Sequence, residues 1–227
     1  MKELLHCPLF EGVSESELSA VIACLGARRM SYARGEAIYS EGDPARSIGI
    51  LISGNAQVIR EDYFGNRSIL ARIEPPDLFA EIFVCAETDR MPVTVIATED
   101  CKALLIDGYR LLHTCGHACA FHQQMIFNLM KILARKNLLF HQKIEITSRR
   151  TTREKLMTYL LLQAKQQQSS RFEIPYDRQE LADYLEVDRS GLSAEISRLR
   201  REGVIECSRN RFRLLENGEK EEEAWPT

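Results

Sequence analysis

The spacing of apolar residues changes character at about residue 108, and this change sets the fold classes open to the chain. Before it, short β-type runs alternate with turn signals such as Glu41-Gly42-Asp43-Pro44. Turns about every 8–12 residues are typical of an antiparallel barrel or jelly roll. After it, a helical period holds for roughly 37 residues. A helix is also predicted over 14–26, and the predicted strands are 37–39, 48–52, 56–59, 68–73, 93–97 and 103–106.

The long helix carries apolar residues in alternating steps of four and three, a spacing typical of a coiled-coil seam. A second apolar row (Ala118, Phe121, Met125, Ile132, Leu139) lies beside the seam. We expect one row to face the chain's own barrel and the other a second copy in parallel; a helix buried in a monomer is the alternative. The predicted dimer interface is Cys119, His122, Ile126, Leu129, Leu133, Lys136 and Phe140.

A helix-turn-helix is predicted after a break near 145–150. Thr151 and Glu154 form a capping box, so a helix begins at about 152. After a predicted strand over 172–175, Asp177 caps a helix over 179–185 and Asp188 caps a second over 189–202. Two strands around Arg209-Asn210-Arg211 then form a hairpin. A hairpin after such a helix pair indicates a winged helix-turn-helix, whose second helix reads the major groove.

The charge distribution supports a nucleic-acid partner for this region. The whole chain has a net charge of −3, yet residues 148–213 contain an excess of basic over acidic side chains. Arg189 is suited to a bidentate contact with guanine, and Ser190 and Ser193 to base edges. The predicted phosphate contacts are Arg178, Gln179, Arg198, Arg200, Arg209 and Arg211.

Composition excludes several protein classes. The stretch 111–130 has membrane-spanning length, but its histidines, glutamines and asparagine are too polar for a lipid-facing helix. The N-terminal segment lacks the apolar run of a secretory leader. The seven cysteines are therefore expected to be reduced thiols, and the protein to be cytoplasmic.

The order of these parts resembles the Crp/Fnr (catabolite activator/fumarate-nitrate reductase regulator) superfamily of bacterial transcription regulators. The most specific matches are 178–185, Val187-Asp188-Arg189-Ser190 and the phrase Ile50-Leu51-Ile52-Ser53-Gly54. The resemblance implies an α+β architecture with a cyclic-nucleotide-binding-like β-jelly-roll at 1–107, a dimerisation helix at 108–147 and a winged helix-turn-helix at 148–227. It also implies a homodimer that binds a two-fold symmetric operator and contacts RNA polymerase.

The chain departs from the cyclic-nucleotide-binding members in the effector pocket. Glu81 matches a family glutamate that could hold a ribose hydroxyl, but Met91 and Pro92 stand where an Arg-Ser pair neutralises the phosphate. Loss of that charge-assisted contact disfavours cyclic AMP by about 1.5–3 kcal/mol. We therefore expect a different small-molecule effector, of unknown identity. The predicted pocket residues are Phe79, Ala80, Glu81, Ile82, Met91, Pro92 and Thr94.

Three alternatives remain at this point. Cys115, Cys119 and His122 share a helix face and could bind zinc or haem iron, or act as a thiol switch, although cysteine at seam positions is more simply a small buried hydrophobe. A cyclic-nucleotide-binding-type adaptor without DNA binding is the second; Arg189 argues against it. A cupin-type enzyme is the third, but residues 28–106 contain no histidine, so we predict no enzymatic activity.

Overall fold

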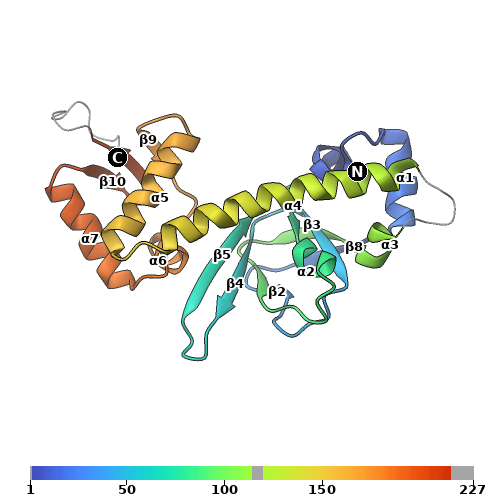
Figure 1. Ribbon diagram of the computed structural model, residues 1–227, viewed down its shortest axis with the longest axis horizontal. Helices are drawn as coiled ribbons and strands as arrows, with labels where there is room; N and C mark the ends of the chain where they lie inside the picture. The colour runs from blue at the N-terminus through green and yellow to red at the C-terminus, as the bar shows by residue number, and fades with distance from the viewer. Residues whose placement is uncertain (1, 114–119, 216–227) are drawn as a thin grey trace. The chain divides into compact units, whose positions relative to one another are not determined.

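The computed structural model describes residues 2–113 and 120–215 of the chain. The fold divides into two compact units, Met1–Leu138 and Leu139–Thr227, and Figure 1 shows the elements of each. No helix in the described part of the chain is long and apolar enough to cross a membrane.

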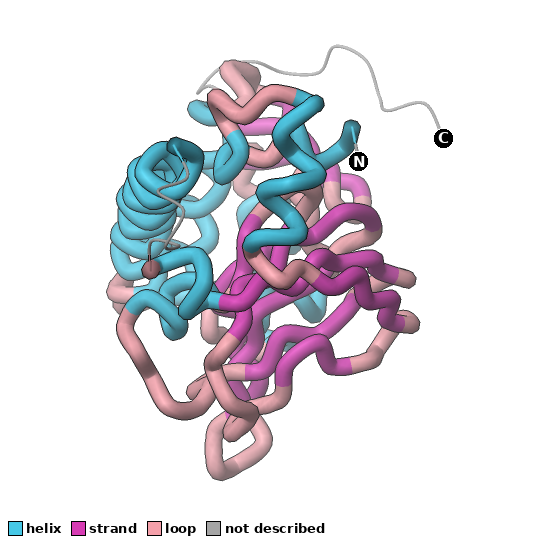
Figure 2. The backbone as a smooth tube through the Cα atoms, turned by 90° about the vertical axis from the view of Figure 1, so that its right-hand side faces the viewer, coloured by secondary structure: helices cyan, strands magenta, loops and turns pink. Residues whose placement is uncertain are grey.

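The first unit is a jelly roll of two antiparallel four-stranded sheets, as the short-strand pattern predicts (Figure 2). One sheet has the order β1-β8-β3-β6 and the other β2-β7-β4-β5. The first sheet contains β1 (Arg28–Tyr32), β8 (Cys101–Asp107), β3 (Ser47–Ser53) and β6 (Leu78–Phe79). The second contains β2 (Ala37–Tyr39), β7 (Thr94–Ala97), β4 (Ala56–Glu61) and β5 (Arg67–Ile73).

Two apolar clusters hold this unit together. One is the barrel interior, with Leu51 and Ala103 from the first sheet and Val95 from the second. The other joins the N-terminal segment and the long helix to strands β3 and β8. The helices that contribute to this second cluster are η1 (Lys2–His6), η2 (Pro8–Phe10), α1 (Glu15–Cys24), α3 (Gly108–Leu112) and α4 (Ala120–Thr147). The short helix α2 (Glu81–Cys85) follows β6.

The helical stretch predicted from residue 108 is not continuous. Helix α3 ends at Leu112, and His113 has extended backbone angles (φ −109°, ψ 131°). Helix α4 begins at Ala120. Cys115 and Cys119 lie outside the described residues. The prediction of one helix from 108 onward is therefore wrong at His113.

The face of α4 that contacts the chain's own jelly roll differs from the expected one. Leu129 is 2% exposed and packs in the same cluster as Met125 and Ile132. His122 is buried, and Lys136 contacts β6 and α2. The seam residues His122, Leu129 and Lys136 therefore contact the chain's own first unit. Phe140 of the seam and Leu139 of the second row are instead 39% and 57% exposed.

A different row of α4 is exposed. Phe127, Met130 and Ile144 are 50%, 54% and 61% exposed, and Ala134 and His141 between them are also exposed. This row again follows steps of three and four, shifted by one residue from the predicted seam. One residue corresponds to a rotation of about 100° around a helix with 3.6 residues per turn.

The second unit is a three-helix domain with a small sheet of order β10-β11-β9. Its core includes Leu156 and Leu160, Leu181 and Leu185, and Leu192, from three successive helices. Its elements are α5 (Thr152–Gln166), β9 (Arg171–Glu173), α6 (Arg178–Leu185), α7 (Arg189–Arg201), β10 (Ile205–Ser208) and β11 (Arg211–Leu214). The predicted winged helix-turn-helix is thus present in the second unit.

Candidate nucleic-acid interface and effector cassette

Helices α6 and α7 begin where acidic N-caps satisfy their free amide groups. The Asp177 carboxylate accepts from the Glu180 amide at 2.8 Å, and Glu180 returns a contact to the Asp177 amide at 2.9 Å. Glu186 ends α6 in a left-handed conformation (φ 54°). Asp188 then accepts from the Gly191 amide at 2.8 Å and starts α7. These caps fix the tight turn between the two helices.

The N-terminal turn of α7 is open to solvent on one side. Arg189, Ser190 and Gly191 are exposed, whereas Leu192 and Ile196 are buried against the domain. The Ser190 hydroxyl donates to the Asp188 carboxylate, so it can accept from a base edge but its proton is already engaged. A Cβ built on Gly191 meets only the Asp188 carboxylate, at 3.8 Å. The backbone at Gly191 is therefore an uncrowded surface.

The arginines predicted to contact phosphate lie around this face and in the wing. Arg178 donates to the Arg209 carbonyl in the wing turn at 3.4 Å, and Arg211 faces Glu173 at 3.5 Å. Arg200 is exposed, while Ser193 is half-buried. The side-chain amide of Gln179, at the start of α6, donates a hydrogen bond to the Asp183 carboxylate.

Arg198 also belongs to an ion-pair network inside the domain. It contacts Glu202 at 2.9 Å, and Glu202 in turn contacts Arg153 of α5 at 2.7 Å. Arg153 extends the network to Glu195 at 3.3 Å. The hydrogen bonds from Arg153 and Arg198 hold the pKa of Glu202 below its usual range. A phosphate contact by Arg198 would have to share this guanidinium with Glu202.

A buried lysine near the end of α4 holds the turn of the helix-turn-helix. Lys143 is 7% exposed, donates to the Tyr184 carbonyl and lies 3.8 Å from the centre of the Tyr184 ring. A cation at the C-terminus of a helix such as α6 is stabilised by the helix dipole. Burial lowers the pKa of Lys143 to about 8, with Glu186 opposing the shift and Lys155 adding to it. Nothing in the sequence pattern singled out this residue.

In the jelly roll, the predicted effector residues surround a packed interior. Phe79 is 1% exposed and belongs to the barrel cluster. Its ring lies directly over Gly49 of β3, where a Cβ would come within 2.0 Å of the ring. Ala80 follows in a left-handed conformation (φ 65°) and starts α2. We call residues 78–85, which include β6, Ala80 and α2, the cassette.

Glu81 of the cassette is bound by the chain's own Lys136. The two side chains form an ion pair of 2.7 Å, in which Glu81 is 1% exposed and Lys136 is 26% exposed. Lys136 also donates to the Leu78 carbonyl at 2.5 Å. The second carboxylate oxygen of Glu81 is buried and has no hydrogen-bond partner in the described part of the chain. Lys136, predicted to face a partner helix, thus contacts the cassette.

The region matching the phosphate-binding pair offers little to an anion. Met91 is 1% exposed and packs in the barrel cluster, while Pro92 is exposed. Arg90 points outward and donates to the Gly42 carbonyl at 2.8 Å. Thr94 accepts from the Glu41 amide at 3.1 Å, and Ile82 is half-buried. The predicted pocket residues are thus neighbours in the fold, but they place no free cation beside Glu81.

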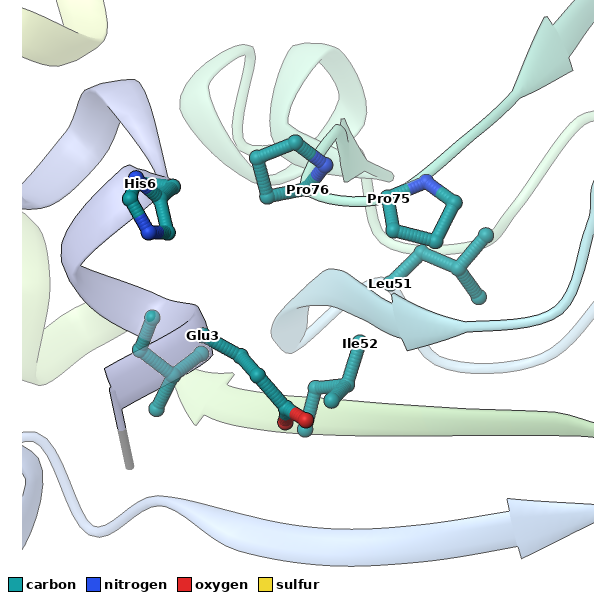
Figure 3. A pocket seen from close by; sticks show the side chains of 7 residues that line it. Glu3, His6, Leu51, Ile52, Pro75 and Pro76 are labelled. Atoms are coloured by element: carbon teal, nitrogen blue, oxygen red, sulfur yellow. The ribbon is translucent and has the colours of Figure 1, made fainter.

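Two hollows on this unit lie elsewhere. The first, of about 270 Å³, lies between the N-terminal segment and β3 (Figure 3). It is lined by Glu3, Leu4, His6, Leu51, Ile52, Pro75 and Pro76. The second, of about 300 Å³, is lined by Ser31, Tyr32, Ala33, Ser53, Asp100, Cys101 and Lys102. Neither hollow includes a predicted effector residue.

Of the three residues of the candidate metal or haem cluster, the structure describes His122. Cys115 and Cys119 lie outside the described residues. His122 is buried, and its Nε2 donates to the Arg110 carbonyl at 3.0 Å. Within residues 2–113 and 120–215, no group of three or more histidine, cysteine or acidic side chains is placed to hold a metal ion.

Comparison with known protein families identifies both units. The family model of the cyclic nucleotide-binding domain matches residues 29–116. The model of the Crp-like helix-turn-helix domain matches residues 154–217. Together the two models match about two thirds of the chain, in the order that the Crp/Fnr resemblance implies.

The chain belongs to the Crp/Fnr family. It is therefore a DNA-binding transcription regulator and not an enzyme.

Curated relatives and solved structures agree with this assignment. The chain is 26% identical over 204 residues to the cyclic AMP receptor protein of Thermus thermophilus, covering 87% of this chain and 88% of the relative. It is 23% identical over 189 residues to FnrA of Stutzerimonas stutzeri, covering 81% and 75%. In fold, the Crp/Fnr chain is similar to the c-di-GMP-responsive regulator CLP of Xanthomonas campestris, with a TM-score of 0.73, 17% identity and coverage of 88% and 99%.

Proposed function

We propose that this Crp/Fnr protein is a homodimer that binds a two-fold symmetric operator through α7. The observation that carries the proposal is the open N-terminal turn of α7, where Arg189 is exposed beside an unobstructed backbone at Gly191. Arg189 is placed to read guanine, with Ser190 accepting at a neighbouring base. Arg178 begins α6, Arg200 lies in the last turn of α7, and Arg209 and Arg211 lie in the wing; all four are suited to the phosphates.

The exposed row of α4 is the surface that we assign to a second copy of the chain. Phe127, Met130 and Ile144 recur at coiled-coil spacing on one face. Apolar rows of this extent are uncommon on monomers. Asn137 and His141 lie in the same row and are exposed; polar residues at such positions fix the register of a helix pair. Parallel pairing of two copies along this row would cover the three exposed apolar side chains and place Asn137 and His141 at the interface.

The signal is not expected to be cyclic AMP. Met91 and Pro92 provide no cation for a cyclic phosphate, and Glu81 is already neutralised by Lys136. Phe79 fills the interior next to them. The carboxylate oxygen of Glu81 that Lys136 holds is closed to a ligand hydroxyl, and the other oxygen is buried. A different signal, or a ligand of other chemistry, therefore controls the regulator. The signal passes along α4 and through the hinge at 145–151 to α7, which contacts DNA. The bound dimer then recruits or blocks RNA polymerase.

The experiment is selection of DNA by the purified wild-type protein from a random duplex pool, without added ligand. The proposal predicts an enriched site with two inverted half-sites whose centres lie about one helical turn apart, roughly 34–36 Å. Sedimentation equilibrium should give a dimer, and Met130→Glu should give monomers that bind the selected duplex at least tenfold more weakly. Arg135→Glu, an acidic change at another exposed position of α4 that lies outside the row, is the matched control. Enrichment of no site, or of a single unpaired half-site, contradicts the proposal.

A further inference from the structure

The contact between Glu81 and Lys136 joins two parts of the first unit that have separate tasks. Glu81 begins α2 within the cassette, and Lys136 lies on α4 one turn beyond the buried residue Ile132. The carboxylate is almost fully buried, and the ammonium group reaches it at 2.7 Å. Lys136 also donates to the carbonyl of Leu78, the first residue of β6. One side chain of α4 therefore satisfies both ends of the turn at Ala80.

The burial of Glu81 makes this cation necessary. An ionised carboxylate removed from water is strongly unfavourable unless a cation or hydrogen-bond donors compensate it. Asp77 is close enough to interact electrostatically with both Glu81 and Lys136, so the surroundings already contain an excess of negative charge. In the described part of the chain, Lys136 is the cation that forms an ion pair with Glu81. Loss of Lys136 therefore favours opening of the cassette to water or binding of an external donor.

We propose that Lys136 acts as an internal ligand of the cassette, and that it closes the cassette on α4 without a small molecule. The inference rests on the proposed DNA-binding function and specifies how that function is regulated. Closure by Lys136 fixes the rotation of α4 on its own jelly roll. The exposed row at Phe127 and Met130 then stays outward, available to a second copy. Operator binding is accordingly constitutive with respect to ligands at Glu81.

The exposed row depends on this rotation because each residue accounts for about 100° around the helix. A cassette that loses Lys136 no longer holds this side of α4, although Met125 and Leu129 still anchor the earlier turns. The effect should therefore be concentrated in the cassette and the second half of α4. It should leave the N-terminal part of the cluster intact.

The test uses the full chain and two readouts. Hydrogen exchange at the amides of Glu81–Cys85 reports closure of the cassette and needs no DNA. Fluorescence anisotropy on a duplex selected by the wild type from a random pool reports operator binding. The variants are Lys136→Met, which keeps the stem but removes the charge, and Lys136→Arg, which keeps the charge. Glu81→Gln combined with Lys136→Met removes the buried charge together with its partner.

The expected result is that Lys136→Met speeds amide exchange over 81–85 at least tenfold and weakens DNA binding at least tenfold. Lys136→Arg should stay within threefold of the wild type in both readouts. The double variant should recover slow exchange but not full DNA binding, because a neutral pair fixes α4 less firmly. One millimolar cyclic AMP should change neither readout for the wild type.

Exchange over 81–85 that is unchanged in Lys136→Met overturns the inference, as does a change of tenfold or more in either readout of the wild type when cyclic AMP is added. If Lys136→Met fails to fold, Lys136→Arg and the double variant still decide the matter through their exchange rates. If the wild type selects no DNA, the proposed function fails, while the exchange comparison still shows whether Lys136 closes the cassette. The two failures are therefore distinguishable.

Discussion

Gly191 is the residue of α7 at which protein stability and DNA binding should respond in opposite directions. It lies in the first turn of α7, with its amide bonded to Asp188. A methyl group placed there meets only the Asp188 carboxylate, at 3.8 Å, which is an ordinary contact. Replacing glycine by alanine in a helix stabilises it by about 0.5–1 kcal/mol, because the unfolded chain loses conformational freedom. Gly191→Ala should therefore raise the free energy of unfolding by about that amount.

The same methyl group should impair operator binding. If α7 enters the major groove by its first turn, the backbone at Gly191 lies against the DNA, and a Cβ must push the helix away. We expect at least a tenfold loss of affinity, which corresponds to about 1.4 kcal/mol. Urea unfolding measures the first effect, and fluorescence anisotropy on the selected duplex measures the second.

Ser197→Ala provides the matched control. Ser197 is exposed on the same helix, and its hydroxyl bonds back to the Ser193 carbonyl at 2.9 Å. Alanine there improves helix propensity but adds no atom, so stability should rise while DNA affinity stays within about threefold. Unchanged affinity of Gly191→Ala, together with higher stability, would refute the close approach of this backbone to DNA.

Three further outcomes follow from the structure. Arg189→Ala should cost about 1–3 kcal/mol of discrimination at one base position of each half-site, measured by repeating the DNA selection; an equal loss on every sequence would show that Arg189 does not read a base. For Lys143, whose pKa is lowered by burial to about 8 from 10.5, the unfolded chain holds its proton to higher pH than the folded chain. The free energy of unfolding should thus rise between pH 8 and 10.5 by on the order of 1–3 kcal/mol relative to Lys143→Met, as urea unfolding at several pH values would show; parallel pH profiles would count against it. Arg153→Ala removes two ion pairs in which Arg153 is 37%, Glu202 36% and Glu195 15% exposed, and because solvent screens such pairs the free energy of unfolding should fall only slightly; a large loss in urea unfolding would mean that the network supports α7 more strongly than its exposure implies.

The second unit was predictable because its boundaries are marked locally. Thr151 and Asp177 each have a glutamate three residues later, and both pairs form the expected reciprocal contacts. The turn between α6 and α7 follows from Asp188 capping the second helix. Such signals depend on neighbours within one helical turn, so the sequence alone contains them. Helices α6 and α7 accordingly begin and end within one residue of their predicted bounds.

The orientation of α4 could not be predicted in the same way. The predicted seam and the exposed row lie one residue apart, and both follow steps of three and four. Which of them faces the barrel depends on where the barrel presents its own apolar surface. The contact of Lys136 with Glu81 is invisible in the sequence for the same reason. Strand β1 was missed because four of its five residues are exposed, so it lacks the alternation of a half-buried strand and is held by pairing with β8.

The packing of Phe79 on Gly49 has a consequence for what the barrel could hold. The ring occupies the interior beside the cassette because residue 49 has no side chain of its own. Phe79→Ala would leave an apolar void of the kind that binds small aromatic molecules when it is created in other cores. The size of this one side chain thus decides whether the jelly roll is solid or hollow next to Glu81. A single substitution would give the domain space for an apolar compound, at a cost of about 3–5 kcal/mol in folding free energy.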